Sequence, residues 1–472
     1  MLAPRIRHLL TLLACAAALA ALPSSASASH GQAVYFEAPR DLLSNSTRDH
    51  AFQQLSALGV RALRVVLYWH DVAPGAGSRR KPSFDATNPS AYNWAKYDVI
   101  LQGAAQRNWQ VLLTVSGPVP RWATPGGRDT VTRPDPLEFH RFMTAVGQHY
   151  GAQVKLFTIW NEPNHPNFLD PQFSGRTPLS PRIYRGLFQA GYSGLHAAPN
   201  AAGAKVLMGD TAPVGTLHDV APLIFLRGAL CLDGHYRMSS TCSLLPADGW
   251  AHHPYTTLAG PFFSPPPDDV TIGVLSRLSR ALDRAAAAGA IHRHLPIYLT
   301  EFGVQSYPDP FNGVSLAQQP EFQAIAEHIA WGNPRVASFS QYLLRDDVVR
   351  GHNIFQQHSG FTTGLEMANG RQKPSYAAWP IPLVVTRHGG RVSLWGLVRP
   401  AAGSATVQVE TADGRGHFRA LLRHSTDRRG YWDAISSFRT HRRWRVRWIA
   451  PGGRVYLGPA IRAYDTRGRL SP

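Results

Sequence analysis

Eight short β-rich runs, separated by longer stretches that can form helices, occupy the chain from residue 30 to about residue 380. This alternation predicts repeated βα units around a parallel sheet. In the helical stretches, apolar residues recur three or four positions apart, which gives each helix one face to bury. The predicted strands cover residues 33–36, 62–68, 110–115, 154–160, 206–209, 249–252, 297–300 and 337–342. The predicted helices cover residues 47–58, 93–107, 136–150, 181–198, 272–288 and 320–331.

Eight strands with intervening helices in about 350 residues predict an α/β fold, a closed (β/α)8 TIM barrel with enlarged loops. An open doubly wound sheet is the alternative. That fold needs a glycine-rich phosphate loop after its first strand, but the sequence there reads Ala38-Pro39-Arg40-Asp41. We therefore expect residues 30–379 to form the barrel.

The pattern changes after residue 382 to short alternating runs separated by Gly and Asp turns, which predicts a small all-β sandwich over residues 383–472. Residues 380–382, Pro-Ile-Pro, are expected to be a linker. In residues 443–448 Arg alternates with apolar side chains, so one face of that strand should pack and the other should be cationic. The predicted strands cover residues 391–398, 405–410, 417–423, 444–449 and 460–464.

The first 29 residues have the features of a secretory signal: basic residues at Arg5 and Arg7, an apolar run over residues 9–22 and an A-x-A site at residues 26–28. A lipoprotein signal that ends at Cys15 is the alternative, although the apolar run continues past that cysteine. No later stretch has about 18 uncharged apolar residues, so no membrane span is expected. The predicted location is secreted or extracytoplasmic.

Removal of the signal leaves two cysteines, Cys231 and Cys242. In an oxidising compartment an even pair predicts a disulfide, and two free thiols are the alternative. A metal site would need further ligands at a suitable spacing, which the sequence around them lacks.

The formal charge of +18 is concentrated in the sandwich. Residues 383–472 hold 17 Arg, no Lys and five acidic residues, a charge of +12, whereas residues 30–382 carry only +4. One hypothesis is that the sandwich binds an anionic cell-surface polymer. The alternative is a solvated Arg-rich face that packs on the barrel. Nucleic acid is not an expected partner of an exported chain.

Two glutamates follow predicted strands: Glu162 in Thr-Ile-Trp-Asn-Glu-Pro-Asn after the fourth, and Glu301 in Ile-Tyr-Leu-Thr-Glu-Phe-Gly after the seventh. The carboxyl ends of barrel strands open on one face, so both side chains should point into one cleft. Two such carboxylates, one protonated and one ionised, can hydrolyse a glycosidic bond.

This pairing resembles clan A of the glycoside hydrolases, (β/α)8 barrels, and within it families 39 and 5. The resemblance implies that Glu162 is the acid/base, Glu301 the nucleophile, and residues 30–379 the catalytic domain. It also implies that Arg64 keeps the nucleophile ionised and that Asn161 binds the sugar 2-hydroxyl.

The resemblance further implies that His253 and Tyr255, after the sixth strand, surround the nucleophile. Many clan members carry Trp at the end of the eighth strand, where this chain has Tyr342, the expected substitute as a sugar platform. The adjacent His252 and His253 should point to opposite faces, which argues against a shared metal ion. Three tryptophans are candidates for stacking on sugar rings, and core packing is the alternative for each: Trp69, Trp122 and Trp160.

The sequence thus predicts a secreted retaining glycoside hydrolase that acts on an oligo- or polysaccharide without metal or cofactor. A non-catalytic carbohydrate- or cell-wall-binding protein on the same scaffold is the alternative. Lyase or transglycosylase activity would share the fold. The sugar, the linkage and endo or exo action depend on loops without readable motifs.

Overall fold

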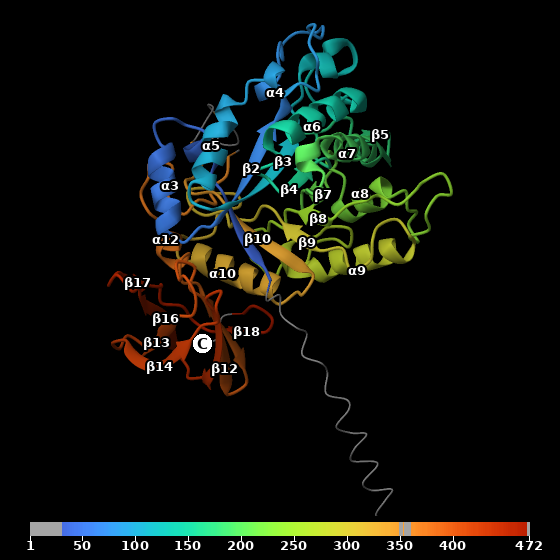
Figure 1. Cartoon of the computed structure of the whole chain (residues 1–472). Helices are drawn as coiled ribbons and strands as arrows, with labels where there is room; N and C mark the ends of the chain where they lie inside the picture. Colours follow the sequence, from blue (N-terminus) through green and yellow to red (C-terminus); the bar gives the residue numbers. More distant parts are fainter. Residues whose placement is uncertain (1–30, 349–352, 354–359, 470–472) are drawn as a thin grey trace, which may run out of the picture.

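The computed structural model describes residues 31–348, 353 and 360–469. The predicted signal, including Cys15, lies outside the described residues. Eight parallel strands close into a barrel in the order β1-β10-β9-β8-β7-β4-β3-β2, with helices packed around them (Figure 1). Each strand overlaps a predicted run, so the predicted TIM barrel is confirmed. The strands are β1 (Ala33–Glu37), β2 (Ala62–Tyr68), β3 (Gln110–Ser116), β4 (Leu156–Ile159), β7 (Lys205–Thr211), β8 (Gly249–His252), β9 (Ile297–Leu299) and β10 (Val336–Tyr342).

Helix α6 (Pro136–Tyr150) illustrates how the sequence sets the helices. The Asp135 side chain accepts hydrogen bonds from two backbone N–H groups of the first turn, at 2.8 and 3.4 Å, and Pro136 occupies the first position. The side chains of Phe139 and Phe142 are fully buried. The other α-helices are α2 (Pro39–Leu42), α3 (Arg48–Ala57), α4 (Trp69–Val72), α5 (Ala95–Ala105), α7 (Ser180–Ala197), α8 (Pro222–Ala229), α9 (Leu275–Ala287), α10 (Gln318–Trp331) and α12 (Pro374–Ala378).

Shorter elements lie in the loops. A two-stranded hairpin pairs β5 (Phe173–Ser174) with β6 (Thr177–Pro178). In the described part of the chain, 3₁₀ turns cover Pro89–Ala91, Arg121–Ala123, Pro125–Gly127, Pro199–Ala201 and Ile272–Val274. Cys231 and Cys242 form the predicted disulfide. Among the described residues, no helix combines the length and apolar character needed to cross a bilayer.

The barrel interior changes from apolar to charged along its axis. Tyr35, Ala62 and Leu112 pack together near the starts of their strands. Two residues further along β1 and β2, on the same side of each strand, come Glu37 and Arg64. The parallel strands therefore carry charged groups toward the end of the barrel where the strands finish.

The C-terminal residues form two four-stranded sheets, β15-β12-β11-β18 and β14-β13-β16-β17, which share one apolar core. This confirms the predicted sandwich, and Trp444, Val446 and Trp448 of β16 are buried as the alternation predicts. Sequence analysis missed β11, β15 and β17, and the predicted strand at 460–464 reduces to β18. The strands are β11 (Leu383–His388), β12 (Arg391–Leu397), β13 (Thr406–Asp413), β14 (Arg419–Ser425), β15 (Tyr431–Ser437), β16 (Arg442–Ile449), β17 (Val455–Leu457) and β18 (Tyr464–Asp465).

The sandwich packs against α10 of the barrel (Figure 1). Residues 380–382, the expected linker, are buried at this junction. Arg399 forms a two-pronged ion pair with Glu327 of α10, at 2.8 and 2.5 Å. The Trp395 ring stacks on His328 with 4.9 Å between ring centres. Aromatic, apolar and ionic contacts thus join the two units.

Candidate active site

Glu162 and Glu301 lie together where β4 and β9 end. One carboxylate oxygen of each, with a ring nitrogen of His253, lie within 4.8 Å of one another. Both side chains retain some exposure, 17% for Glu162 and 10% for Glu301. The backbone N–H of Glu162 donates to the carbonyl of Asp210 at 2.9 Å, which fixes the end of β4 beside β7. Residues 139 positions apart in the sequence therefore face a common space.

The guanidinium of Arg64, fully buried on β2, is the centre of the site. Its Nη1 contacts the carboxylates of Glu37, at 2.5 Å, and of Glu301. Its Nη2 donates to Asn161 at 2.6 Å and to Asp210 at 2.8 Å. Burial favours loss of the proton, but the three carboxylates together hold the pKa of Arg64 well above its ordinary value. One permanent cation thus links four acceptors from different strand ends.

His253 bridges the carboxylates on the other side of the site. Its Nδ1 lies 2.8 Å from Glu162 and 3.6 Å from Glu301, and its Nε2 lies 3.1 Å from Asp210. Burial lowers the pKa of His253, but Glu301 and Asp210 outweigh burial and raise it to about 10. The ring is therefore an imidazolium at neutral pH and donates from both nitrogens.

His252 is turned away from these carboxylates, as the strand alternation predicts. Its ring lies 2.9 Å from the hydroxyl of Thr211 and 2.8 Å from the carbonyl of Val270. Burial lowers the pKa of His252 to about 4, so it is neutral. Of these two neighbouring histidines, His252 is thus neutral and His253 is a cation, because only His253 faces the carboxylates.

Two tyrosines flank Glu301. The hydroxyl of Tyr255 donates to its Oε2 at 3.0 Å. Tyr342 packs edge-on against Tyr255, with 6.5 Å between ring centres, and against Phe361, with 5.1 Å. Burial and then the charge of Glu301 raise the pKa of both tyrosines well above the ordinary value, so both stay protonated. Their rings and hydroxyls form one wall beside the carboxylate.

The three candidate tryptophans pack among other aromatic rings. Trp69 has no exposed surface and stacks on Phe142 in the core between barrel and helices, with 5.0 Å between ring centres. Trp122 packs edge-on against Trp69 and donates from Nε1 to the carbonyl of Pro74 at 3.1 Å. Trp160 is buried as well. All three rings therefore take part in core packing, and stacking of any of them on a sugar stays a prediction.

Sequence reasoning missed Glu37 and Asp210. Glu37 ends β1, so the rule that selected Glu162 and Glu301 could have found it. Burial raises its pKa to about 7 although Arg64 opposes the shift. Burial also acts to raise the pKa of Asp210, but Arg64 and His253 outweigh it and lower the value to about 2. Asp210 lies at an irregularity between Gly209 and Thr211, where β7 and β8 change register.

The carboxylates and His253 are close enough to surround a cation. However, an imidazolium that donates from both nitrogens has no lone pair to offer a metal ion. Metal binding would therefore require His253 to lose a proton and its hydrogen bond to Glu162 or Asp210. The donor set fits an ion-pair network better than a metal centre.

Comparison with known proteins finds similar chains among solved structures. No protein-family model matches the chain, and no curated protein matches it. A family 39 glycoside hydrolase from the gut symbiont Bacteroides cellulosilyticus WH2 is similar over 87% of this chain and 80% of that chain, at 15% identity and a TM-score of 0.52. A glucosidase from Croceicoccus marinus covers 86% and 91%, at 11% identity and a TM-score of 0.49. The first similarity shows a shared fold.

Proposed function

We propose that this chain is a retaining glycoside hydrolase whose catalytic pair is Glu162 and Glu301. The observation that carries the proposal is that one carboxylate oxygen of Glu162 lies within 4.8 Å of one carboxylate oxygen of Glu301. Carboxyl groups about 5 to 5.5 Å apart serve double displacement, whereas inverting enzymes hold them about 6.5 to 9.5 Å apart to admit a water molecule. The fold shared with a family 39 glycoside hydrolase agrees with this proposal.

In this mechanism Glu301 attacks the anomeric carbon while Glu162 donates a proton to the departing oxygen. Arg64 and Tyr255 both contact Glu301, and these two donors keep its attacking oxygens oriented. Glu162 then removes a proton from the water that releases the sugar from Glu301. The bond to Arg64 fixes the carboxamide of Asn161, so its amide nitrogen is the group that we assign to the sugar 2-hydroxyl.

We also propose that the protein acts outside the cytoplasm after loss of residues 1–29. The disulfide between Cys231 and Cys242 supports this location, because such bonds persist in oxidising compartments. Mass determination of the mature N-terminus tests it. A chain that begins at residue 30 is expected, whereas a lipid-modified Cys15 at the N-terminus would contradict this proposal.

A panel of aryl glycosides and polysaccharides, with the anomer of the released sugar followed by NMR, tests the activity. Glu301→Gln should abolish turnover. Glu162→Ala should retain measurable turnover only of substrates with good leaving groups, since these need no proton donor. Glu138→Gln, a change on α6 in an ion pair with Lys81, is the matched control and should keep the wild-type rate.

Release of the inverted anomer would overturn the assignment of Glu301 as nucleophile. Wild-type rates in both active-site variants would overturn the catalytic pair. Binding of a polysaccharide without cleavage by the wild-type chain would favour the non-catalytic carbohydrate-binding alternative.

A further inference from the structure

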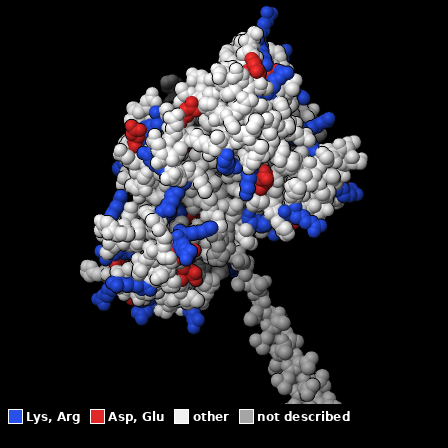
Figure 2. Space-filling model, viewed as in Figure 1, with Lys and Arg blue, Asp and Glu red and all other residues white. Residues whose placement is uncertain are grey.

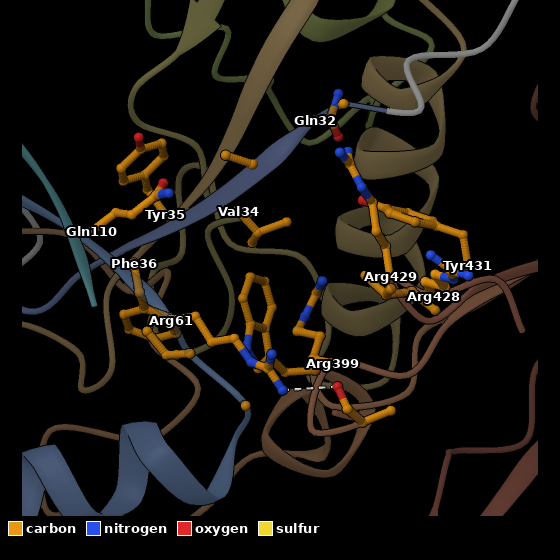
Figure 3. A pocket seen from close by; sticks show the side chains of 17 residues that line it. Gln32, Val34, Tyr35, Phe36, Arg61, Gln110, Arg399, Arg428, Arg429 and Tyr431 are labelled. Carbon is orange, nitrogen blue, oxygen red and sulfur yellow. Dashed lines mark hydrogen bonds between the residues drawn. The ribbon is translucent and has the colours of Figure 1, made fainter. Parts of the chain in front are cut away.

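A pocket of about 410 Å³ lies at the junction of barrel and sandwich, among the starts of the barrel strands. The barrel contributes residues 31–36 at β1, 59–61 before β2 and Gln110 at the start of β3. The sandwich contributes Arg399, the segment 428–429 and Tyr431 (Figure 3). Because Glu162 and Glu301 follow the opposite ends of their strands, this pocket is separate from the proposed active site.

The pocket lining is cationic. It contains four arginines, Arg61, Arg399, Arg428 and Arg429, and no Asp or Glu. Glu327 neutralises Arg399, and Arg61 donates one hydrogen bond, to the carbonyl of Ala401 at 2.8 Å. Figure 3 shows Gln32 and Arg429 toward one end of the pocket, with Arg61 and Arg399 toward the other. Figure 2 shows basic side chains spread over the face in view, on the barrel as well as on the sandwich, so this lining is one concentration among several basic groups.

Several buried polar groups in the same lining lack hydrogen-bond partners among the described residues. Gln32 is 5% exposed, and neither its amide oxygen nor its amide nitrogen has a partner in the part of the chain that the structure describes. The same holds for the hydroxyl of Tyr431, a residue 7% exposed. Buried polar groups are nearly always paired, because an unpaired one costs free energy. An amide donor, an amide acceptor and a hydroxyl are therefore available beside the arginines.

The rest of the lining includes three aromatic side chains, Tyr35, Phe36 and Trp379, together with small and aliphatic residues and Gln110. The volume falls within the range of roughly 300 to 1,000 Å³ that is common for small-molecule sites. Guanidinium groups bind carboxylates and phosphates in a two-pronged geometry. Aromatic faces and an amide suit the apolar ring faces and the hydroxyls of a sugar.

We propose that this junction pocket binds an anionic saccharide unit, whose carboxylate or phosphate pairs with Arg428 and Arg429 and whose hydroxyls bond to Gln32 and Tyr431. The site would hold a charged polymer away from the proposed catalytic carboxylates. In this proposal, part of the positive charge of the sandwich binds a ligand at one defined site. The proposal does not depend on the proposed hydrolase activity.

Calorimetric titration of the full mature chain tests the proposal, with D-galacturonate, D-glucose 6-phosphate, inorganic phosphate and D-glucose as probes. At least one of the two sugar anions should bind, and which of them binds identifies the charged group. The double variant Arg428→Gln/Arg429→Gln should weaken this binding about tenfold or more, because each arginine supplies charge-assisted hydrogen bonds. The matched control is Arg419→Gln/Arg423→Gln, which removes two exposed arginines from β14 outside the pocket and should change affinity less than about twofold.

A third variant separates binding from folding. Gln32→Leu removes the unpaired amide, so it should keep or raise the melting temperature while it weakens binding of the sugar anion. If both arginine double variants weakened binding of the sugar anion equally, the net charge of the chain would explain the effect, and the proposed site would be overturned. The site is also overturned if neither sugar anion binds at millimolar concentration, if the pocket variants bind as the wild type does, or if inorganic phosphate binds as tightly as the sugar anions, which would mean an adventitious ion only.

Discussion

Glu37 and Arg64 form an ion pair inside the barrel, with 2.5 Å between Oε2 of the carboxylate and Nη1 of the guanidinium. The same Nη1 contacts Glu301. The proposed nucleophile therefore shares its cationic partner with a second carboxylate, and the ionisation of Glu37 determines how much of that charge is left for Glu301.

Glu37→Gln should lower kcat/KM about 10- to 100-fold, because Arg64 loses a charged partner that fixes its position. Burial raises the pKa of Glu37 to about 7, so the wild-type rate should also change near pH 7 as Glu37 ionises and competes for Arg64. That inflection should be absent in the variant. Rates with an aryl glycoside between pH 5 and 9 measure both effects. The control variant Thr114→Val removes an uncharged hydrogen-bond partner of Arg64 at 3.1 Å and should keep the change in rate near pH 7. If the pH dependence of the rate in Glu37→Gln matched that of the wild type, Glu37 would not control the charge of Arg64 that acts on Glu301.

Asp210→Asn should lower the free energy of unfolding by about 3 to 5 kcal/mol, because it leaves part of the charge of Arg64 and His253 buried without its counterion. Urea unfolding followed by fluorescence measures the change. Asp283→Asn is the control: its side chain is 58% exposed in an ion pair with Arg335, and its loss should cost less than about 1 kcal/mol. If both variants lost a similar amount of free energy of unfolding, the buried network would not stabilise the fold more than an exposed ion pair does.

The stability of the folded chain should depend on pH through His253. The nearby acids raise its pKa in the folded state to about 10, above the value of about 6.5 in an unfolded chain. The contribution of His253 to the free energy of unfolding is therefore complete below pH 6.5 and is lost as the pH rises through about 10. His253→Gln should lower stability at pH 6 and flatten the decline between pH 6.5 and 10. Urea titrations at several pH values measure this, and a decline as steep as in the wild type would contradict it.

Arg399→Met should destabilise the chain by about 3 to 5 kcal/mol, because Glu327 would remain buried without its cation. Arg399→Met with Glu327→Leu should recover much of the loss, since no charge is then left unpaired. Arg439 forms a 3.5 Å ion pair with Asp413, and its side chain is 65% exposed. The control variant Arg439→Met should therefore change the free energy of unfolding by less than about 1 kcal/mol. Urea unfolding of these chains and of the single variant Glu327→Leu measures the coupling, and additive effects of the two single changes would show that the two residues act independently.

Much of the barrel could be predicted because its strands are short apolar runs and its helices carry one apolar face. The sandwich was harder. Leu383–His388 and Tyr431–Ser437 form strands whose exposed and buried positions alternate imperfectly, so pairing with β12 rather than local pattern makes them strands. The aromatic residues show the same limit, because Trp69 follows a strand end but packs between helices.

The alternation of short apolar runs with helical stretches is enough to predict a parallel barrel with Glu162 and Glu301 on one face, because strand ends in such a barrel share a direction. Only the tertiary structure brought Glu37 and Asp210 to Arg64. Asp210 reaches the guanidinium through a register change in β7, with φ of 50°, and strand periodicity cannot signal such a change. The junction pocket also depends on tertiary structure, because its lining comes from segments more than 300 positions apart in the chain.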